Sequence, residues 1–171
     1  EGFEATKREG LNSFGDDRVF IEKFILDPRH IEIQILGDKH GNVLYLNERE
    51  CSIQRRYQKV IEETPSPILN DELRTRMAAS AVAMAKSAGY TNAGTVEFLV
   101  DAQTGEYYFL EMNARIQVEH PITEETLRLD MVEWQTRIAA GKLISLSQED
   151  IRPSGHAVEC RIYAEDPYSN F

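Results

Sequence analysis

The chain has 171 residues, of which 19 are Lys or Arg and 29 are Asp or Glu, so its formal net charge is −10. This excess of negative charge argues against general nucleic-acid binding, which depends on neutralising phosphates. Hydrophobic residues make up 42% of the chain, but no uninterrupted apolar run approaches the ~20 residues that a membrane-spanning helix needs. The composition therefore predicts a water-soluble globular protein, with one sizeable core or with one core and a smaller satellite, rather than a disordered chain.

The ends of the chain and its cysteines suggest a segment of a longer intracellular protein. The first residue is Glu1 rather than Met, and the last residues follow closely on a strand-like stretch, so we expect further chain on both sides. Cys51 and Cys160 lie far apart and form no CxxC pair, which predicts reduced thiols in an intracellular compartment. Two buried cysteines acting as small hydrophobic residues would give the same pattern.

The first third of the chain is predicted to contain a helix followed by a hairpin. Residues 1–14 mix charged and apolar residues at helical spacing and end at a Gly-Asp-Asp turn. Residues 19–26 and 30–36 are strand-like and are separated by Asp-Pro. In the second of these strands, isoleucines alternate with Glu32 and Gln34, which predicts a strand with one buried and one exposed face.

The middle of the chain continues the antiparallel pattern. A third strand is predicted at residues 43–46, after which residues 47–67 lose their periodicity. An alanine-rich helix is predicted over residues 70–88, from an Asn-Asp start to a glycine stop. Residues 95–101 and 107–112 then read as two strands joined by a short turn.

The last part of the chain predicts one long helix and one strand. The helix spans residues 123–140 and ends at Gly141, and the strand spans residues 156–164. Together these elements predict the α+β class, with an antiparallel sheet and flanking helices. Four side chains outside the motifs described below are expected to pack in the core rather than bind a ligand: Phe3, Phe14, His120 and Trp134.

The hairpin formed by residues 95–101 and 107–112 brings two carboxylates together. A turn at its centre pairs Glu97 with Glu111, places Asn113 on the same face and pairs Leu99 with Phe109. Hard oxygen donors without a neighbouring His or Cys suit Mg²⁺ or Mn²⁺ better than Zn²⁺. Alternatively, the carboxylates spread apart on an exposed face, and a slip of one residue in register would remove the pair.

The stretch after this hairpin combines three polar groups that could bind and deprotonate an oxyanion. In an extended conformation, Arg115, Gln117 and Glu119 share one side of the chain, and Pro121 disfavours a helix at His120. An arginine can hold a planar oxyanion through two hydrogen bonds, and a neighbouring carboxylate can act as a general base. The alternative is an ordinary surface ion pair.

A basic segment interrupts the acidic chain at residues 52–59, with the sequence SIQRRYQK. Arg55, Arg56 and Lys59 predict a specific anion site, for example for phosphate. Alternatively, they form a solvated turn that pairs with the surrounding glutamates. There is no glycine-rich phosphate loop in the chain.

At these motifs the sequence resembles the biotin carboxylase family, the ATP-dependent component of biotin-dependent carboxylases. The matching strings are EKFILDPRHIEIQ, ERECSIQRRYQKVIEE, AGTVEF, FLEMNARIQVEHPITE and GHAVECRIYAEDP. The likeness is greatest to acyl-CoA carboxylases of the propionyl- or methylcrotonyl-type. It implies the C-terminal part of an ATP-grasp fold over residues 1–153 and the start of the family's C-terminal domain over residues 154–171.

The resemblance also implies a ligase reaction and its participants. ATP and bicarbonate form carboxyphosphate with Mg²⁺ or Mn²⁺, and a nitrogen of biotin, attached to a separate carrier domain, is then carboxylated. The implied partners are the biotin carboxyl carrier domain and a carboxyltransferase subunit or domain, in an oligomeric full-length protein. The compartment would be the cytoplasm in a bacterium or the mitochondrial matrix in a eukaryote; neither a nucleic-acid nor a membrane partner is expected.

Carried over motif by motif, the resemblance assigns site residues. The nucleotide would contact Glu22, Lys23, Ile25, His30 and Gln54. The metal would be held by Glu97, Glu111 and Asn113. Bicarbonate would be held by Lys59, Arg115, Gln117, Val118 and Glu119, and biotin would face Arg161. Among these, Glu119 would remove the bicarbonate proton, Arg115 would stabilise the intermediate and Lys59 would complete the catalytic set.

Two departures from the family pattern leave a second function open. Tyr57 stands where the family usually has His, and Arg128 stands where it usually has Gly. These changes favour a non-catalytic ATP-grasp module that serves assembly of a carboxylase complex. A ligase that uses another acid, such as a carbamoyl-phosphate-type enzyme, is a weaker option because Arg161 and the RIQVEHP string argue against it. We expect the chain by itself to be a poor catalyst.

Overall fold

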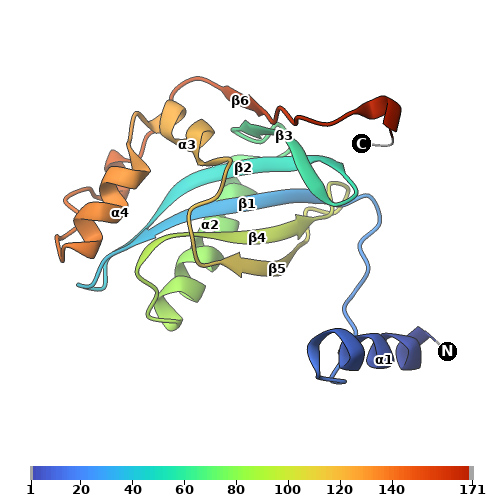
Figure 1. Ribbon diagram of the computed structural model, residues 1–171. Helices are drawn as coiled ribbons and strands as arrows, with labels where there is room; N and C mark the ends of the chain where they lie inside the picture. The colour runs from blue at the N-terminus through green and yellow to red at the C-terminus, as the bar shows by residue number, and fades with distance from the viewer. Residues whose placement is uncertain (1, 170–171) are drawn as a thin grey trace.

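The computed structural model describes residues 2–169, which form one antiparallel sheet with helices on both of its faces (Figure 1). The strands are β1 (Arg29–Gly37), β2 (Val43–Arg55), β3 (Gln58–Thr64), β4 (Asn92–Val100), β5 (Tyr107–Asn113) and β6 (Ala157–Cys160). The helices are α1 (Gly2–Phe14), α2 (Asp71–Ser87), α3 (His120–Leu127) and α4 (Met131–Ala139), with 3₁₀ turns at Gln148–Asp150 and Pro167–Ser169. The strand order is β5-β4-β1-β2-β3-β6, which confirms the predicted α+β class.

Strand β1 lies at the centre of this sheet and is covered on both faces. Its isoleucines pack with α2 in one apolar core. On the opposite face, Leu36 belongs to a second core that includes Trp134 of α4, so the expectation for Trp134 is confirmed. Glu32 and Gln34 point to this second face and are fully buried. The prediction of one exposed face was wrong, because the loop before α3 and the helices α3 and α4 cover it.

A bulge in β2 determines which of its residues face which side. Ile35 pairs with Tyr45 and Ile33 with Glu48, so β2 carries one extra residue between these pairs. Asn47 in this stretch has φ +68°, a left-handed conformation that asparagine tolerates better than most residues. Because side chains alternate along a strand, the extra residue moves Arg49 to the face of the sheet opposite α2. There Arg49 pairs with Glu32 of β1.

Helix α2 forms where the sequence predicts it. Asn70 is the N-cap, and its side chain accepts a hydrogen bond of 2.8 Å from the backbone N–H of Leu73. After the helix, Gly89 has φ +58°, a conformation that glycine adopts without strain. The hairpin of β4 and β5 is also confirmed.

Several other predicted elements differ from the structure. Residues 19–26 form no strand, and β1 instead pairs with β2 and β4. Residues 47–67 are largely regular, since β2 continues to Arg55 and β3 follows after a two-residue turn. The predicted helix over 123–140 is two helices, because Arg128 adopts a left-handed conformation between them. The last strand is limited to Ala157–Cys160.

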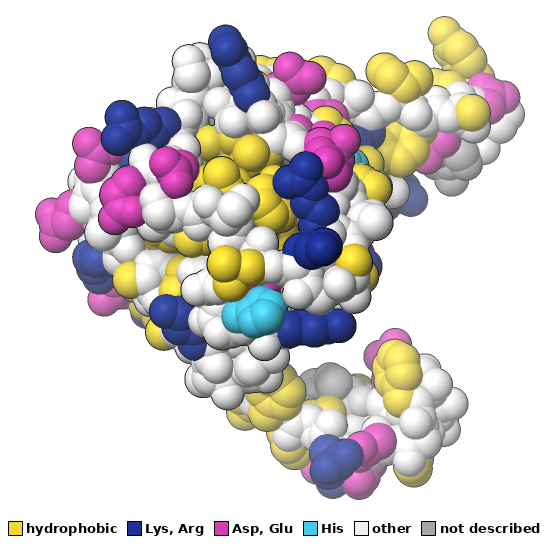
Figure 2. Space-filling model, turned by 90° about the vertical axis from the view of Figure 1, so that its left-hand side faces the viewer, with side chains coloured by type: hydrophobic (Ala, Val, Ile, Leu, Met, Phe, Trp, Pro, Cys, Tyr) yellow, Lys and Arg dark blue, Asp and Glu magenta, His cyan; other side chains and the backbone are white. Residues whose placement is uncertain are grey.

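Helix α1 forms as predicted but projects from the sheet (Figure 1). Phe3 is 49% exposed and Phe14 is 86% exposed, so the expectation that they pack in a core was wrong for the described residues. Figure 2 shows hydrophobic side chains on the surface of this projecting lobe and of the segment that joins it to the sheet. None of the described helices is long and apolar enough to cross a membrane.

Candidate functional site

A cleft of about 720 Å³ lies on the face of the sheet opposite α2. Strands β1 to β5, the segment before β1, the loop before α3 and the residue after β6 all contribute to its walls. Every site residue that the family resemblance assigned lines this cleft except Glu22, which is exposed and lies outside it. The structure therefore brings together residues that are up to 138 positions apart, from Lys23 to Arg161.

Lys59 of β3 connects three carboxylates at the base of the cleft. Its Nζ lies 2.5 Å from Oε2 of Glu32, 3.0 Å from Oε1 of Glu97 and 2.7 Å from Oε1 of Glu119. The Lys59 side chain is only 12% exposed. Its burial alone would lower the pKa of the ammonium group, but the three acids outweigh this effect and raise the pKa well above its usual range. Lys59 therefore carries a fixed positive charge inside the cleft.

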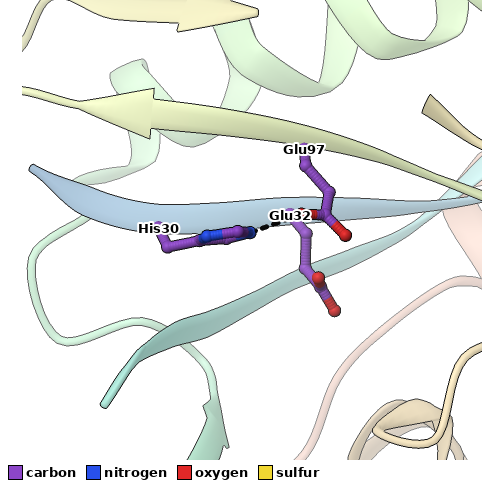
Figure 3. Close-up of side chains that lie close together, drawn as sticks. All are labelled: His30, Glu32 and Glu97. Atoms are coloured by element: carbon purple, nitrogen blue, oxygen red, sulfur yellow. Dashed lines mark hydrogen bonds and ion pairs between the residues drawn. The ribbon is translucent and has the colours of Figure 1, made fainter. Parts of the chain in front are cut away.

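Glu97 of β4 is the most heavily hydrogen-bonded of these acids. Its Oε2 lies 2.6 Å from Nε2 of His30 (Figure 3), and its Oε1 accepts hydrogen bonds from Lys59, Asn113 and Gln117. Burial disfavours the carboxylate, but the hydrogen bond from His30 and the charge of Lys59 lower its pKa to about 2. Glu97 is therefore ionised at neutral pH and presents hard oxygen ligands.

The predicted carboxylate pair is present in the hairpin of β4 and β5. Glu97 pairs directly with Glu111, as predicted, while a register shift beside them pairs Leu99 with Tyr108 rather than with Phe109. The side-chain amide of Asn113 donates to Oε1 of Glu97 and to Oε1 of Glu111, at 2.9 Å each. This donor offsets the repulsion between the two carboxylates. Two convergent carboxylates joined by one amide fit the oxygen ligands that Mg²⁺ or Mn²⁺ prefers, but the expectation that no histidine lies beside them was wrong, since His30 contacts Glu97.

Two other groups of potential ligand atoms converge in the cleft, but neither is well suited to a metal ion. In one group a lysine already neutralises the carboxylates, and in the other the cysteine is protonated. His30, Glu32 and Glu97 converge from β1 and β4 (Figure 3), yet Lys59 already contacts both carboxylates. Glu32 and Glu119 converge with Cys51, whose pKa is raised by burial and by the nearby acids. A protonated thiol is a poor metal ligand. The pair formed by Glu97 and Glu111 is the better candidate for a divalent cation, because Glu111 is exposed and, among the described residues, is bonded by Asn113 rather than by Lys59.

The loop before α3 delivers Gln117 and Glu119 to Lys59 and Glu97, although the loop is not extended as predicted. The chain turns at residues 118–119, and α3 begins at His120, with Pro121 in its first turn, a position where proline is accommodated. Gln117 and Glu119 are nevertheless both buried. Arg115 is exposed and donates a hydrogen bond of 3.2 Å to Oδ1 of Asn113.

Glu119 lies between two cations. Its Oε1 contacts Lys59, and its Oε2 accepts a hydrogen bond of 2.9 Å from Arg161. Burial opposes ionisation of Glu119, but the charge and hydrogen bond of Lys59 prevail and lower the pKa of the carboxyl group. Glu119 is therefore a carboxylate that could accept a proton once one of these contacts is released.

The residues assigned to the nucleotide, apart from Glu22, line the same cleft, and one of them, His30, contacts Glu97. Ile25 is buried, and Lys23 contacts Tyr108 and lies 3.6 Å from Glu106. Nδ1 of His30 accepts a hydrogen bond of 3.1 Å from the amide of Gln54, so its Nε2 carries the proton that is donated to Glu97.

The basic segment at residues 52–59 is the hairpin between β2 and β3. Gln54 and Lys59 point into the cleft, and Arg55 pairs with Glu165 at 2.8 Å. Tyr57 occupies the turn, is 99% exposed and borders the cleft. Lys59 alone of the three predicted cations contributes to the walls of the cleft.

Sequence reasoning missed two residues beneath the cleft, Glu32 and Arg49. The guanidinium of Arg49 is fully buried and bonds Glu32, Gln34, Thr123, Thr95 and Gln117. The alternation of polar residues with isoleucines gave no signal of this burial, because in an antiparallel sheet such a pattern usually marks a solvated face.

Comparisons with known proteins agree with this geometry. The chain is 60% identical over its full length to propionyl-CoA carboxylase alpha chains from Ruegeria pomeroyi and from human mitochondria, and it spans 25% and 23% of these relatives. A solved relative is the biotin carboxylase domain dimer of 2-oxoglutarate carboxylase from Hydrogenobacter thermophilus, in complex with ADP, magnesium-ADP and bicarbonate. It is 51% identical with a TM-score of 0.90, and the match covers 99% of this chain and 37% of that one. The expected ATP-grasp fold and the resemblance to biotin carboxylases are confirmed.

A family model described as the carbamoyl-phosphate synthase L chain, ATP binding domain, matches residues 1–147. With most of the chain inside this match, the protein belongs to that family of ATP-binding domains.

Proposed function

We propose that this chain is the part of a biotin carboxylase that binds Mg-nucleotide, bicarbonate and biotin. The observation that carries the proposal is the contact of one ammonium group, Lys59, with both Glu97 and Glu119. Glu97 belongs to the candidate metal pair, and Glu119 is the candidate base. One cleft therefore holds the groups needed for phosphoryl transfer beside the groups needed to deprotonate bicarbonate.

The chemistry follows from the charges in the cleft. Bicarbonate would lie between Lys59, Arg115, Gln117 and the backbone of Val118, where two cations offset its charge. Glu119 would accept its proton when the contact with Lys59 or Arg161 is released, and the bicarbonate oxygen would then attack the γ-phosphate of ATP, breaking its bond to the β,γ-bridging oxygen and releasing ADP. Arg115 would stabilise the resulting carboxyphosphate, and Arg161 would stabilise the negative oxygen of the biotin ureido group during carboxylation.

Glu97, Glu111 and Asn113 would hold Mg²⁺ or Mn²⁺, which would neutralise charge on the phosphates during transfer. Lys23, Ile25, His30 and Gln54 would border the nucleotide. The position of Glu22 outside the cleft limits any role for it to contacts with groups beyond this face.

The wider protein can be proposed from the relatives. The chain spans about a quarter of the matched carboxylase alpha chains, which supports a larger enzyme with a biotin carrier domain, a carboxyltransferase partner and an oligomeric assembly. The equal identity to a bacterial and a mitochondrial propionyl-CoA carboxylase supports an acyl-CoA carboxylase of that type, in the cytoplasm of a bacterium or in the mitochondrial matrix. The family match ends at residue 147, which supports an ATP-binding domain over residues 1–153 and a following domain from residue 154.

The second candidate is a non-catalytic module for assembly. The observation that favours it is Tyr57, which borders the cleft with an exposed neutral phenol in place of the expected imidazole. Arg128 gives this alternative little support, because it is exposed at the end of α3 and does not line the cleft.

The test is bicarbonate-dependent ATP hydrolysis with free biotin by the full-length protein. Glu119→Gln and Arg115→Ala should each lower kcat/KM by at least about 100-fold, since they remove a base and an oxyanion contact. Glu125→Gln and Arg152→Ala, which change the same residue types at exposed positions outside the cleft, should leave the rate within about twofold. A well-folded full-length protein without activity would support the assembly module instead.

A further inference from the structure

Two glutamates lie opposite each other on the neighbouring strands β3 and β6, an arrangement that does not stabilise the fold. Glu62 of β3 pairs directly with Glu159 of β6, and like charges at such positions repel. Glu62 is fully buried. In the described part of the chain, Oε2 of each glutamate is buried without a hydrogen-bond partner. An unsatisfied buried carboxylate oxygen destabilises the fold, so another role must account for this arrangement.

Within the part of the chain that the structure describes, the Glu62 side chain makes one hydrogen bond, and its partner is Arg161. Oε1 of Glu62 accepts from Nε of Arg161 at 2.7 Å. The other end of the same guanidinium donates from its Nη2 to Oε2 of Glu119 at 2.9 Å. The Arg161 side chain is 18% exposed and lines the cleft. The planar guanidinium of Arg161 is therefore held between two carboxylates: the buried Glu62 at Nε and the candidate catalytic Glu119 at Nη2.

The two carboxylates that contact Arg161 differ in what else they bind. Glu119 also contacts Lys59, so it keeps a cation if Arg161 turns away. Glu62 depends on Arg161 alone among residues 2–169. Burial raises the pKa of Glu62, and the charge of Arg161 opposes this rise. Removing Arg161 would therefore leave Glu62 buried without a partner, whereas Glu119 would remain paired.

We propose that Glu62 is a positioning residue that anchors Arg161 through Nε, so that the Nη2 end of the guanidinium is directed into the cleft toward the ureido oxygen of biotin. The anchor at Nε fixes the plane of the guanidinium while its tip exchanges Glu119 for biotin. Glu159 adds a second negative charge beside the anchor and strengthens its hold on the cation. The role of biotin here rests on the function proposed above; the anchoring of Arg161 does not.

The kinetic test uses the full-length protein with free biotin and three variants. Glu62→Ala should raise KM for biotin at least about tenfold, while bicarbonate-dependent ATP hydrolysis without biotin stays within about twofold. Glu62→Gln, which keeps an acceptor oxygen in the same place, should restore most of the loss. Glu63→Ala is the matched control on the same strand, because Glu63 bonds His156 instead, and it should leave both activities unchanged. Glu62→Ala should add nothing in an Arg161→Gln background.

An unchanged KM for biotin in Glu62→Ala, or a parallel loss of both activities, would overturn the proposal. A second measurement does not depend on activity. In ¹⁵N-resolved NMR spectra the Nε–H of Arg161 should exchange slowly in the wild type and in Glu63→Ala, and at least about tenfold faster in Glu62→Ala. Slow exchange that survives in Glu62→Ala would refute the anchor. A wild-type protein without ATP hydrolysis but with the expected exchange pattern would refute the proposed function and leave the anchor supported.

Discussion

The buried guanidinium of Arg49 donates a hydrogen bond of 3.1 Å to the side-chain oxygen of Gln117. Through this bond, a residue of β2 buried beneath the cleft holds a residue of the loop before α3. Gln117 in turn donates to Glu97 at 2.7 Å. The loop that carries the candidate base is therefore attached to the sheet by a chain of buried polar contacts rather than by apolar packing alone.

Replacing Arg49 by lysine should destabilise the protein by about 3–5 kcal/mol, because one ammonium cannot serve the five partners of the guanidinium and leaves several buried acceptors without a donor. Urea denaturation at pH 7 measures this difference. Arg18→Lys is the control, since Arg18 is 88% exposed, and it should change the free energy of unfolding by less than about 0.5 kcal/mol. A loss below about 1 kcal/mol in Arg49→Lys would contradict the structural role given to this network.

Asp38 provides a second test, in the turn between β1 and β2. It is 2% exposed and accepts hydrogen bonds from the backbone N–H groups of His40, Asn42 and Ile144 and from the Asn42 side chain. Burial opposes ionisation, but these donors lower the pKa of Asp38 to about 2. Asp38→Ala should cost about 2–3 kcal/mol at pH 7, the value typical of hydrogen bonds to a charged group.

The pH dependence of this loss has a definite sign. A carboxyl group with a lowered pKa in the folded state stabilises the protein above its unfolded pKa of 3.8, and this stabilisation is lost as the pH falls toward 2. The difference between wild type and Asp38→Ala in urea denaturation should therefore be constant from pH 7 to about pH 5 and should shrink below pH 4. A difference that grows as the pH falls would contradict this assignment. Asp17→Ala, at an exposed residue, serves as the control.

The sequence predicted the pair formed by Glu97 and Glu111 because a hairpin is local. The predicted centre of the turn was nevertheless wrong: next to the turn, Phe98 pairs with Phe109, and the extra residue Leu110 then brings Glu111 opposite Glu97. Glu32 and Arg49 could not be found in the same way. Their pairing depends on the position of β1 between β2 and β4 and on the extra residue near Asn47, neither of which leaves a periodic signal.

The sequence also indicated a change at the end of α3 without revealing its consequence. Arg128 was recognised as a departure from glycine, but helical periodicity continues past it, so one helix was predicted over 123–140. In the structure Arg128 has φ +54°, and its backbone N–H bonds the carbonyl of Glu124 at the end of α3. The next helix starts anew from its N-cap, Asp130. One left-handed residue, which propensity alone does not reveal, separates the two helices.

Arg128→Gly should therefore stabilise the protein by about 1 kcal/mol, because glycine adopts a left-handed conformation without the steric cost that a Cβ imposes. Thermal or urea denaturation measures the change. The same substitution at Arg76, an exposed residue inside α2, should have the opposite sign and cost about 1 kcal/mol. Destabilisation by Arg128→Gly would show that the arginine side chain makes an important contact.

Tyr57→His separates the two proposed functions most directly. Tyr57 borders the cleft at the turn between β2 and β3, where an imidazole could donate a hydrogen bond to a phosphate of the nucleotide. One such bond corresponds to about 1–1.5 kcal/mol, so Tyr57→His in the full-length protein should tighten binding of Mg-ADP by roughly 5–10-fold, measured by calorimetry. The gain should be larger at pH 6 than at pH 8, because a protonated imidazole binds an anion more strongly.

Tyr168→His, at an equally exposed tyrosine outside the cleft, should leave the affinity unchanged. If neither protein binds Mg-ADP measurably while both remain folded, the cleft does not serve a nucleotide, and the assembly module becomes the better explanation of the fold.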